Sequence, residues 1–424
     1  MRRIVWALLL LYTFTIPWEY SLDLGAPLGN VARITGLLVL LAAIPAVLQS
    51  GRLRTPGAVQ WFVLALYLWF CGSLLWTINR AVTFEKVRGS FQELMIVWLV
   101  WEFAETPEDL RSLLRAFIAG TWVLAILTIV NFNSPEAIAL GQYRFAAYGQ
   151  DPNDVARFLD LGFPLAALLA NSQAGAWPES CASVWPERVL AIGYLPLGLV
   201  AVLLTASRGG FLAALVALIG CALLLGRGHA RAVLTGAFAL PAIAAGLWLV
   251  IPSETFARLA TIPEQLRRGD LNQRLNIWSA GLHAFMRAPI LGTGAGTFVS
   301  AAGLSPIDTA HNTALSIAVS TGLLGVTIVT AIIALVAFAA LHTEASLRRA
   351  LLITLLVWAV TSSVSTVEDS RTTWLLFAVI AVAGRMAVED HTELAECFPD
   401  PRSGWHIPIS RARAAALSAN SAQF

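Results

Sequence analysis

The chain has 424 residues, of which 57% are hydrophobic and only 13% charged, and its formal net charge at pH 7 is +2. Soluble globular domains carry about 25% charged residues, and the mean hydropathy here is +0.71, so an ordinary soluble protein is excluded. We expect a membrane protein with no nucleic-acid partner.

Apolar runs long enough to cross a bilayer core of about 30 Å recur along the whole chain. We predict about twelve transmembrane helices, hence an all-α polytopic membrane protein. The runs are 4–18, 31–49, 59–77, 89–104, 113–131, 154–171, 189–205, 210–226, 232–251, 312–340, 349–366 and 371–388. The first run ends at Pro17, Trp18 and Glu19 without a small-residue cleavage site, so we predict a retained helix and not a removed signal peptide.

The orientation follows from the basic residues, which favour cytoplasmic loops. If consecutive runs cross the membrane in alternating directions, eleven arginines lie on one side. They are Arg2, Arg3, Arg52, Arg54, Arg111, Arg188, Arg227, Arg231, Arg348, Arg349 and Arg385. Both termini are then cytoplasmic. Several basic residues fall on or near the outer side against this bias, namely Arg33, Arg80, Lys86, Arg88, Arg144, Arg157, Arg208 and Arg371. These outer residues need a separate explanation.

The main interruption of the apolar rhythm is a long polar loop at 252–311, which the alternation places outside the cytoplasm. At about sixty residues it far exceeds the connections of two to eight residues common between packed helices, and long loops usually carry function. We predict one transmembrane domain over 1–388 that includes this loop, and a cytoplasmic tail at 389–424. The four cysteines show no disulfide or zinc spacing, and we expect no metal and no cofactor.

Within the loop, the segment 271–286 has the period of an amphipathic helix. Its apolar residues at spacings of three and four are Leu271, Leu275, Trp278, Leu282 and Phe285. At 100° per residue Arg274 projects into the arc of these residues, whereas His283 falls elsewhere. An inward arginine is costly unless an anion pairs with it, so Arg274 is a candidate anion ligand.

Two further motifs carry residues suited to chemistry. Ser207-Arg208-Gly209-Gly210 joins two apolar runs by a hairpin so short that Arg208 lies at the membrane surface or inside it. The alternative is an interfacial arginine that reaches the phospholipid headgroups. His311-Asn312 ends the long loop, and histidine suits proton transfer near neutral pH. The alternative is a helix cap or a hydrogen-bonded interface residue.

Three other features have a structural interpretation that we prefer. The glycine-rich segment 289–298 superficially resembles a phosphate-binding loop but lacks the preceding strand, so we predict a flexible turn. Asp151-Pro152-Asn153-Asp154 contains a carboxylate pair that could bind a metal, yet an N-cap, a proline at the first helical position and an acid in the first turn are typical of a helix start. Asp160 and Glu93 lie inside apolar runs, as a transporter's proton relay would.

The order and spacing of four motifs resemble the O-antigen ligase and O-antigen polymerase superfamily. The motifs are Ser207-Arg208-Gly209-Gly210, Arg274 with Trp278, the segment 289–298, and His311-Asn312 followed by 322–325. The resemblance implies a GT-C-like glycosyltransferase of the bacterial inner membrane with its active site on the periplasmic side. Its donor would be a glycan on undecaprenyl pyrophosphate, without a nucleotide sugar. Its acceptor would be the lipid A core oligosaccharide in the ligase branch, or a lipid-linked repeat unit in the polymerase branch.

The resemblance also implies roles for individual residues. Arg208 and Arg274 would stabilise the departing diphosphate, because arginine binds phosphate oxygens with charge-assisted hydrogen bonds, and His311 would orient or deprotonate the acceptor hydroxyl. The expected reaction inverts the anomeric centre and needs no metal. Further substrate contacts would come from Lys86, Arg80, Arg88, Arg144 and Asn312. The segment 151–154 would shape the acceptor side.

Within the superfamily the length of about 420 residues favours a ligase over an O-antigen or exopolysaccharide polymerase. Two other classes remain open at this point. A proton-coupled transporter or flippase would depend on Asp160 or Glu93 and work without His311. A non-catalytic scaffold of a polysaccharide export complex would tolerate the loss of His311 and of both arginines.

Overall fold

The computed structural model describes residues 1–25, 29–136, 142–171, 185–225, 251–269, 271, 273–305 and 308–397. Every regular element in this part of the chain is helical, which confirms the all-α prediction. The predicted run at 232–251 and the arginines at 227 and 231 lie outside the described residues, as does the tail beyond 397.

Each predicted run in the described part coincides with a helix. These helices are α1 (Arg2–Thr15), α2 (Val31–Ser50), α3 (Ala58–Ser73), α4 (Arg80–Phe103), α5 (Pro107–Phe132), α7 (Pro152–Ala170), α8 (Trp185–Leu204), α9 (Arg208–Leu225), α15 (Thr313–Leu341), α16 (Ala345–Ser362) and α17 (Arg371–Cys397), and the short 3-10 helix η1 (Ile16–Ser21) follows α1. Among the described residues, seven helices are long and apolar enough to cross a membrane, namely α2, α5, α8, α9, α15, α16 and α17 as far as Glu389. The count of twelve therefore stays a prediction.

Helix α7 forms the centre of one half of the bundle. It is buried from Val155 to Leu169 and packs against α5, α8, α9 and α16. Its start agrees with the prediction: Asp151 is the N-cap and accepts a hydrogen bond from the backbone N–H of Asn153 (2.8 Å), and Pro152 occupies the first turn. In the other half, α4 packs on α17, and α15 packs on α3 and α17.

The outward faces of several helices are strongly apolar. Exposed leucines and isoleucines follow α2 at Leu37, Leu38, Leu41, Ile44 and Leu48, and α9 at Leu215, Ile219 and Leu223. Large contiguous apolar surfaces of this kind are rare on soluble proteins. They fit helices whose outer faces contact lipid.

Several arginines of the predicted inner side lie in ion pairs near the start of α1. Arg2 pairs with Glu105 (2.5 Å), and Arg54 also approaches Glu105 (3.8 Å). Arg385 donates to the backbone oxygen of Trp101 (2.9 Å). On the neighbouring helices Arg111 pairs with Glu187 at 2.9 Å, and their side chains are only 1% and 2% exposed. These arginines are thus positioned by protein carboxylates and carbonyls.

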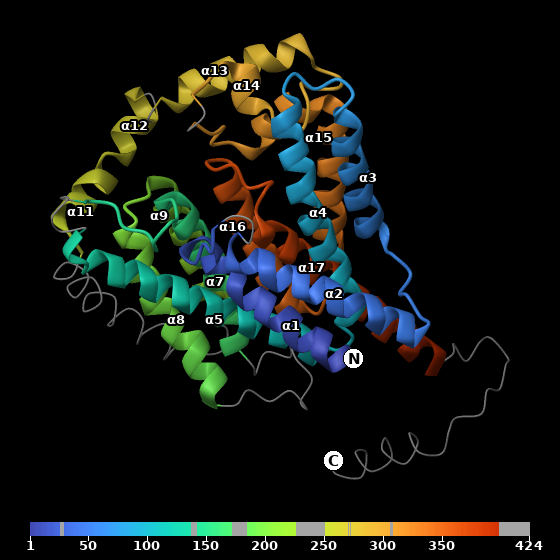
Figure 1. Ribbon diagram of the computed structural model, residues 1–424. Coiled ribbons are helices and arrows are strands. Elements are labelled where there is room, and N and C mark those ends of the chain that lie inside the picture. Colours follow the sequence, from blue (N-terminus) through green and yellow to red (C-terminus); the bar gives the residue numbers. More distant parts are fainter. Residues whose placement is uncertain are drawn as a thin grey trace.

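The long loop folds into an arch of four short helices at the opposite end of the bundle from the N-terminus (Figure 1). They are α11 (Ser253–Ala260), α12 (Ile262–Arg268), α13 (Arg274–Arg287) and α14 (Phe298–Ala302). One end of the arch is anchored by Phe256 and Leu259, which pack on Phe145 and Leu204. The other end is anchored by α13 and α14, whose apolar residues pack on Val319 of α15.

Helix α13 confirms the predicted amphipathic helix but corrects its apolar face. The helix begins at Arg274 and not at residue 271, and its buried residues are Ile277, Gly281 and Ala284. Leu275 and Leu282, which we expected to be buried, are 48% and 55% exposed. The reason is that α13 packs on α14 and α15 through a face centred on the direction of Arg274. The leucines point about 90° away from that face.

The glycine-rich segment is a docked structural element, and the predicted flexible turn is wrong. Helix α15 is broken at Gly322, whose φ and ψ are 68° and −171°. The freed carbonyls of Val319 and Ser320 accept hydrogen bonds from the backbone N–H groups of Thr293 (2.9 Å) and Gly294 (3.0 Å). In return, the N–H of Leu323 donates to the carbonyl of Pro289 (2.8 Å). The segment 289–297, here called the glycine loop, thereby fills the break in α15.

We expect Gly292→Ala to destabilise the protein by about 2–4 kcal/mol. Its φ is +71°, and an added Cβ would lie 2.5 Å from the backbone N of Gly322 and from the Ser320 oxygen. Gly303→Ala is a matched control, because φ is also positive (+67°) but no heavy atom lies within 4 Å. Only backbone strain of about 1 kcal/mol is expected there. Thermal unfolding in detergent compares the two, and equal losses would contradict the close docking of the glycine loop.

Candidate active site

Arg208 lies beneath the arch and faces residues of the long loop. It is the first residue of α9, directly after the hairpin that follows α8. Its Nε donates to the backbone oxygen of Arg258 (3.3 Å) and its Nη2 to Thr261 Oγ1 (2.6 Å). Arg258 in turn donates from Nε to the backbone oxygen of Ala206 (3.0 Å). These contacts to loop residues disagree with the alternative of an arginine that only reaches lipid headgroups.

Arg144 joins the same region through the start of α7. Its Nη2 donates to Asn153 Oδ1 (2.9 Å), and its Nε donates to the backbone oxygen of Thr205 (3.2 Å). Asn153 Oδ1 also accepts a hydrogen bond from Ser207 Oγ (2.9 Å). One amide side chain therefore connects Arg144 to the hairpin that carries Arg208.

Arg274 lines a small cavity, with a volume of about 10 Å³, beneath α13. The other residues around it are Asn153, Arg157, Ser207, Gly209, Gly210, Thr361, Val364 and Ser365. Close packing explains why residue 210 is a glycine, because a Cβ on Gly210 would lie 2.4 Å from the Ala156 Cβ on α7. The prediction that Arg274 points inward agrees with this position. We call this space the arginine pocket.

Several positive charges lie close together around the arginine pocket. Burial lowers the pKa of Arg274, and the nearby Arg144 and Arg208 lower it further, whereas Asp151 opposes them. Burial and then Arg258 lower the pKa of Arg144. The arginines are therefore near enough to one another for each to act on the pKa of the next. Arg144, Arg208, Arg258 and Arg274, here called the arginine cluster, thus form a site suited to a multiply charged anion.

His311 lies next to this cluster in an unusual backbone conformation. Its φ is +47°, a left-handed value that is uncommon outside glycine, and such strain gathers at functional sites. Its Nδ1 lies 3.2 Å from Thr309 Oγ1. Burial and then the Arg274 guanidinium lower the pKa of His311, while Asp151, Asp154 and Asp308 oppose the shift. The ring is therefore neutral at pH 7 and able to accept a proton.

The segment around His311 is held from two directions. From α13, Trp278 Nε1 donates to the backbone oxygen of Ala310 (3.0 Å). From the link between α16 and α17, the N–H of Val367 donates to Thr313 Oγ1 (2.9 Å), which itself donates to the Ser365 oxygen (2.8 Å). Trp278 and Thr313 thus fix the position of the histidine relative to Arg274.

Asn312, and not His311, caps α15. Its Oδ1 accepts a hydrogen bond from the backbone N–H of Leu315 (2.9 Å), and its Nδ2 donates to the Ser363 oxygen (3.3 Å). The interpretation of His311 as a helix cap is therefore wrong, because Asn312 is the cap. Both hydrogen bonds use the side-chain amide of Asn312, which we predicted from the sequence to contact the substrate.

The other three predicted contacts lie on α4, and no contact in the described part of the chain joins them to the arginine cluster. Lys86 forms an ion pair with Asp369 and lies 5.2 Å from the centre of the Phe70 ring. Arg88 pairs with Glu85, and both side chains are exposed. Arg80 is exposed in the first turn of the helix. Of the predicted residues, the structure therefore brings together Arg144, Arg208, Arg274 and His311.

Sequence reasoning did not assign Arg157 or Arg258 to the site. Arg157 had a signal, since it falls on the outer side against the usual bias and one turn after Asp154, with which it pairs at 3.1 Å. Asn153 lies in the segment 151–154, which the resemblance assigned to the acceptor side, but it contacts Arg144 and lines the arginine pocket. Arg258 has no local signal, because only the fold of the arch brings it back to Ala206.

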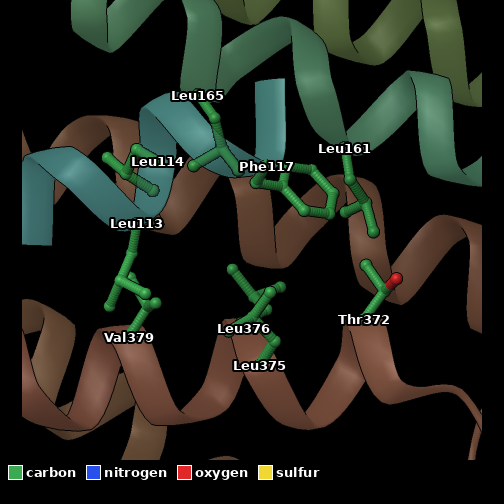
Figure 2. A pocket seen from close by; sticks show the side chains of 9 residues that line it. All are labelled: Leu113, Leu114, Phe117, Leu161, Leu165, Thr372, Leu375, Leu376 and Val379. Carbon is green, nitrogen blue, oxygen red and sulfur yellow. The ribbon is translucent and has the colours of Figure 1, made fainter. Parts of the chain in front are cut away.

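A second cavity is lined by apolar side chains and by Thr372. It is small, with a volume of about 20 Å³, and lies between α5, α7 and α17, where Leu161 and Leu165 of α7 face Leu375 and Leu376 of α17 (Figure 2). Leu161 and Leu165 follow Arg157 at intervals of four residues, so they continue the same face of α7. The apolar cavity has no ionisable lining residue.

The fold and the site define a multi-pass helical membrane protein with a cationic pocket beside a neutral histidine. Residues 193–330 match the family model described as O-antigen ligase. This segment contains Arg208, Arg274, His311 and Gly322, and it confirms the resemblance to the O-antigen ligase superfamily. This part of the chain is thus similar to an O-antigen ligase domain. No curated protein matches the chain.

Proposed function

We propose that the protein transfers a glycan from undecaprenyl pyrophosphate to a hydroxyl group of the lipid A core oligosaccharide. The observation that carries this proposal is the position of a neutral, half-buried His311 beside the arginine cluster. A base and a binding site for a leaving anion are the two parts that such a displacement needs. We place the reaction on the periplasmic face of the bacterial inner membrane.

We place the diphosphate of the donor at the arginine cluster. Arg274 and Arg157 line the arginine pocket, and Arg208 and Arg144 stand beside it. Guanidinium groups bind phosphate oxygens bidentately and stay charged when partly buried. They would supply the positive charge that a metal ion supplies in other phosphate sites, so we propose a reaction without a metal.

His311 would act on the acceptor as the general base. The acceptor oxygen forms a bond to the anomeric carbon, its proton passes to the imidazole, and the carbon–oxygen bond to the diphosphate breaks. The bonding electrons leave with the diphosphate, whose new charge the arginines stabilise. A single displacement of this kind inverts the anomeric configuration. Because the bound diphosphate offsets the charge of Arg274, donor binding would also make His311 a stronger base.

The sidedness that we propose rests on the separation of the charged residues. The arch, whose helices α11 and α13 carry Arg258 and Arg274, lies at one end of the bundle, and the N-terminus lies at the other (Figure 1). Arg2, Arg54 and Arg385 gather near the N-terminal end, as the cytoplasmic bias of basic residues predicts. A periplasmic arch places the site on the side where lipid-linked glycans await transfer.

A transporter would require a connected relay of ionisable groups across the membrane. Asp160 is fully buried in α7, and neither of its carboxylate oxygens has a hydrogen-bond partner among the described residues. Glu93 faces a separate cavity beside Lys86 and Arg371. Since no described contact connects the two acids, no observation favours the transporter.

The proposal is tested with the full chain in lipid vesicles, supplied with a glycan on undecaprenyl pyrophosphate and with lipopolysaccharide that ends at the core. We expect the glycan to move to the core and undecaprenyl pyrophosphate to be released, without any nucleotide sugar. A parallel reaction without lipopolysaccharide tests the polymerase, which would lengthen the glycan on its carrier. If vesicles that contain the folded protein form neither product, the proposed transferase activity is contradicted.

A further inference from the structure

Two adjoining cavities with both polar and apolar walls lie beside the arginine pocket, between α4, the glycine loop and the start of α17. One has a volume of about 170 Å³ and is lined by Lys86, Thr309, Ser316, Ser320 and Glu368 among others. The second has a volume of about 330 Å³ and is lined by Tyr20, Glu85, Glu93 and Arg371 among others. Lys86, Gly296 and Asp369 belong to both, so we treat them as one space and call it the carboxylate cavity.

The link between α16 and α17 separates the carboxylate cavity from the arginine pocket. Val364 and Ser365 line the arginine pocket, whereas Thr366, Glu368 and Asp369 line the carboxylate cavity. Thr309 and Ala310 also line the carboxylate cavity, and Thr309 Oγ1 contacts His311 Nδ1 at 3.2 Å. The candidate base is therefore adjacent to both spaces.

The walls of the carboxylate cavity contain polar atoms with unused hydrogen-bonding capacity. Ser320 is only 4% exposed, and its Oγ has no partner among the described residues. The same holds for Thr366 Oγ1 and for Glu368 Oε2, although the other oxygen of Glu368 accepts a bond from Ser316 Oγ. Buried polar groups are normally paired, since each one left unpaired costs free energy. These atoms are placed to bind a ligand that offers several hydroxyl groups.

The cations that line the cavity are already paired. Lys86 is paired with Asp369, and Arg371 is paired with Glu19 and also donates to Gln92. Glu85, which pairs with Arg88, and Glu93 and Glu368 add carboxyl groups along the walls, and burial raises the pKa of Glu368. A diphosphate would compete with these carboxyl groups for the paired cations, whereas sugar hydroxyls can form hydrogen bonds with the carboxyl groups themselves. The lining also includes the aromatic rings of Phe70, Phe298 and Tyr20, against which the apolar faces of sugars can pack.

We propose that the carboxylate cavity binds the acceptor glycan, with Glu368 and Ser320 hydrogen-bonded to its hydroxyl groups so that one hydroxyl faces His311. The proposal rests on the proposed function, and it assigns Lys86 to the acceptor side and not to the diphosphate. The two substrates then meet across the link between α16 and α17.

The experiment uses the full chain in lipid nanodiscs and measures binding of three probes. One is undecaprenyl pyrophosphate, and the others are two glycans freed of phosphate and lipid: core oligosaccharide and a single O-antigen repeat unit. The glycan that binds tells a ligase from a polymerase. We expect Glu368→Gln and Ser320→Ala each to weaken glycan binding about tenfold or more, with the affinity for undecaprenyl pyrophosphate unchanged within about twofold. Glu264→Gln, an exposed residue of α12, is the matched control and should change neither.

The proposal is overturned if neither glycan binds the wild type, if both cavity variants bind glycan normally, or if both lose the two kinds of ligand in parallel. Arg274→Ala separates this result from a failure of the proposed function. This variant should weaken the binding of undecaprenyl pyrophosphate and leave the binding of the glycan unchanged. If Arg274→Ala leaves undecaprenyl pyrophosphate binding intact, the donor side of the proposed function fails, and the glycan probes still decide the cavity.

Discussion

Replacing His311 by alanine is expected to lower the rate of glycan transfer by about 10²- to 10⁴-fold, the range usual for a positioned general base. The protein should still insert and still bind undecaprenyl pyrophosphate, because the arginine cluster remains. Transfer by purified protein in vesicles measures the first effect, and binding of the carrier lipid measures the second. Asn312 caps the helix that follows, so helix α15 should stay folded in this variant.

The pH dependence of transfer gives an independent check on His311. The neutral imidazole is the active form, so activity is present above the pKa and lost as the pH falls through it. Burial and Arg274 lower this pKa from its ordinary value of 6.5. The loss of kcat/KM, which reports the free enzyme, should therefore occur below pH 6.5, and His311→Ala should lack it. A variant within a few-fold of wild type, or with the same acid limb, would leave His311 a structural role only.

Removing either Arg208 or Arg274 should abolish most transfer while the protein remains folded. Each charged hydrogen bond to phosphate contributes about 1.5–3 kcal/mol, so Arg→Ala should slow transfer by about 10- to 100-fold or more for each bond lost. Lysine should rescue poorly, because a point ammonium cannot form the bidentate fork. Arg52→Ala is the matched control, since Arg52 is exposed in the link between α2 and α3 and lines neither the arginine pocket nor the carboxylate cavity. The measurement is transfer rate together with affinity for undecaprenyl pyrophosphate.

Near wild-type rates in both lysine variants would argue against specific recognition of the diphosphate. A loss in Arg208→Ala alone would have a different meaning. Arg208 bonds to Arg258 and Thr261, so such a result would assign it to holding the arch in place. Arg274 has no such bond to explain a loss among the contacts described here, and its variant is the more direct test of phosphate binding.

The helices were predictable because their signals are local. Length and apolarity locate α2, α5 and α15, and the start of α7 followed from Asp151 and Pro152 alone. The apolar face of α13 was not predictable in the same way. Leu275 and Leu282 are as apolar as the residues that are buried, and only the packing of α13 on α14 and α15 decides which side is covered.

In the candidate site too, some residues carry a local sequence signal and others are identified only by their contacts in the fold. Arg208, Arg274 and His311 stand out in the sequence because each is a polar residue in an apolar or helical context. Lys86 and Arg88 carried the same outer-side signal as Arg144, and charge bias could not separate them. The structure separates them through their partners, since Asp369 and Glu85 neutralise the first two, whereas Arg144 is bonded to Asn153 and Thr205.

The docking of the glycine loop also fixes the length of part of the chain. Its residues form hydrogen bonds with α15 on both sides of the break at Gly322. Thr293 and Gly294 bond to residues before the break, and Pro289 bonds to Leu323 after it. Adding or removing one residue between Pro289 and Gly294 would move one set of bonds out of register with the other. Gly303, with no heavy atom within 4 Å of an added Cβ, has no such constraint. An affinity tag or a reporter peptide for the arch therefore belongs next to Gly303, and the glycine loop should keep its number of residues in any redesigned chain.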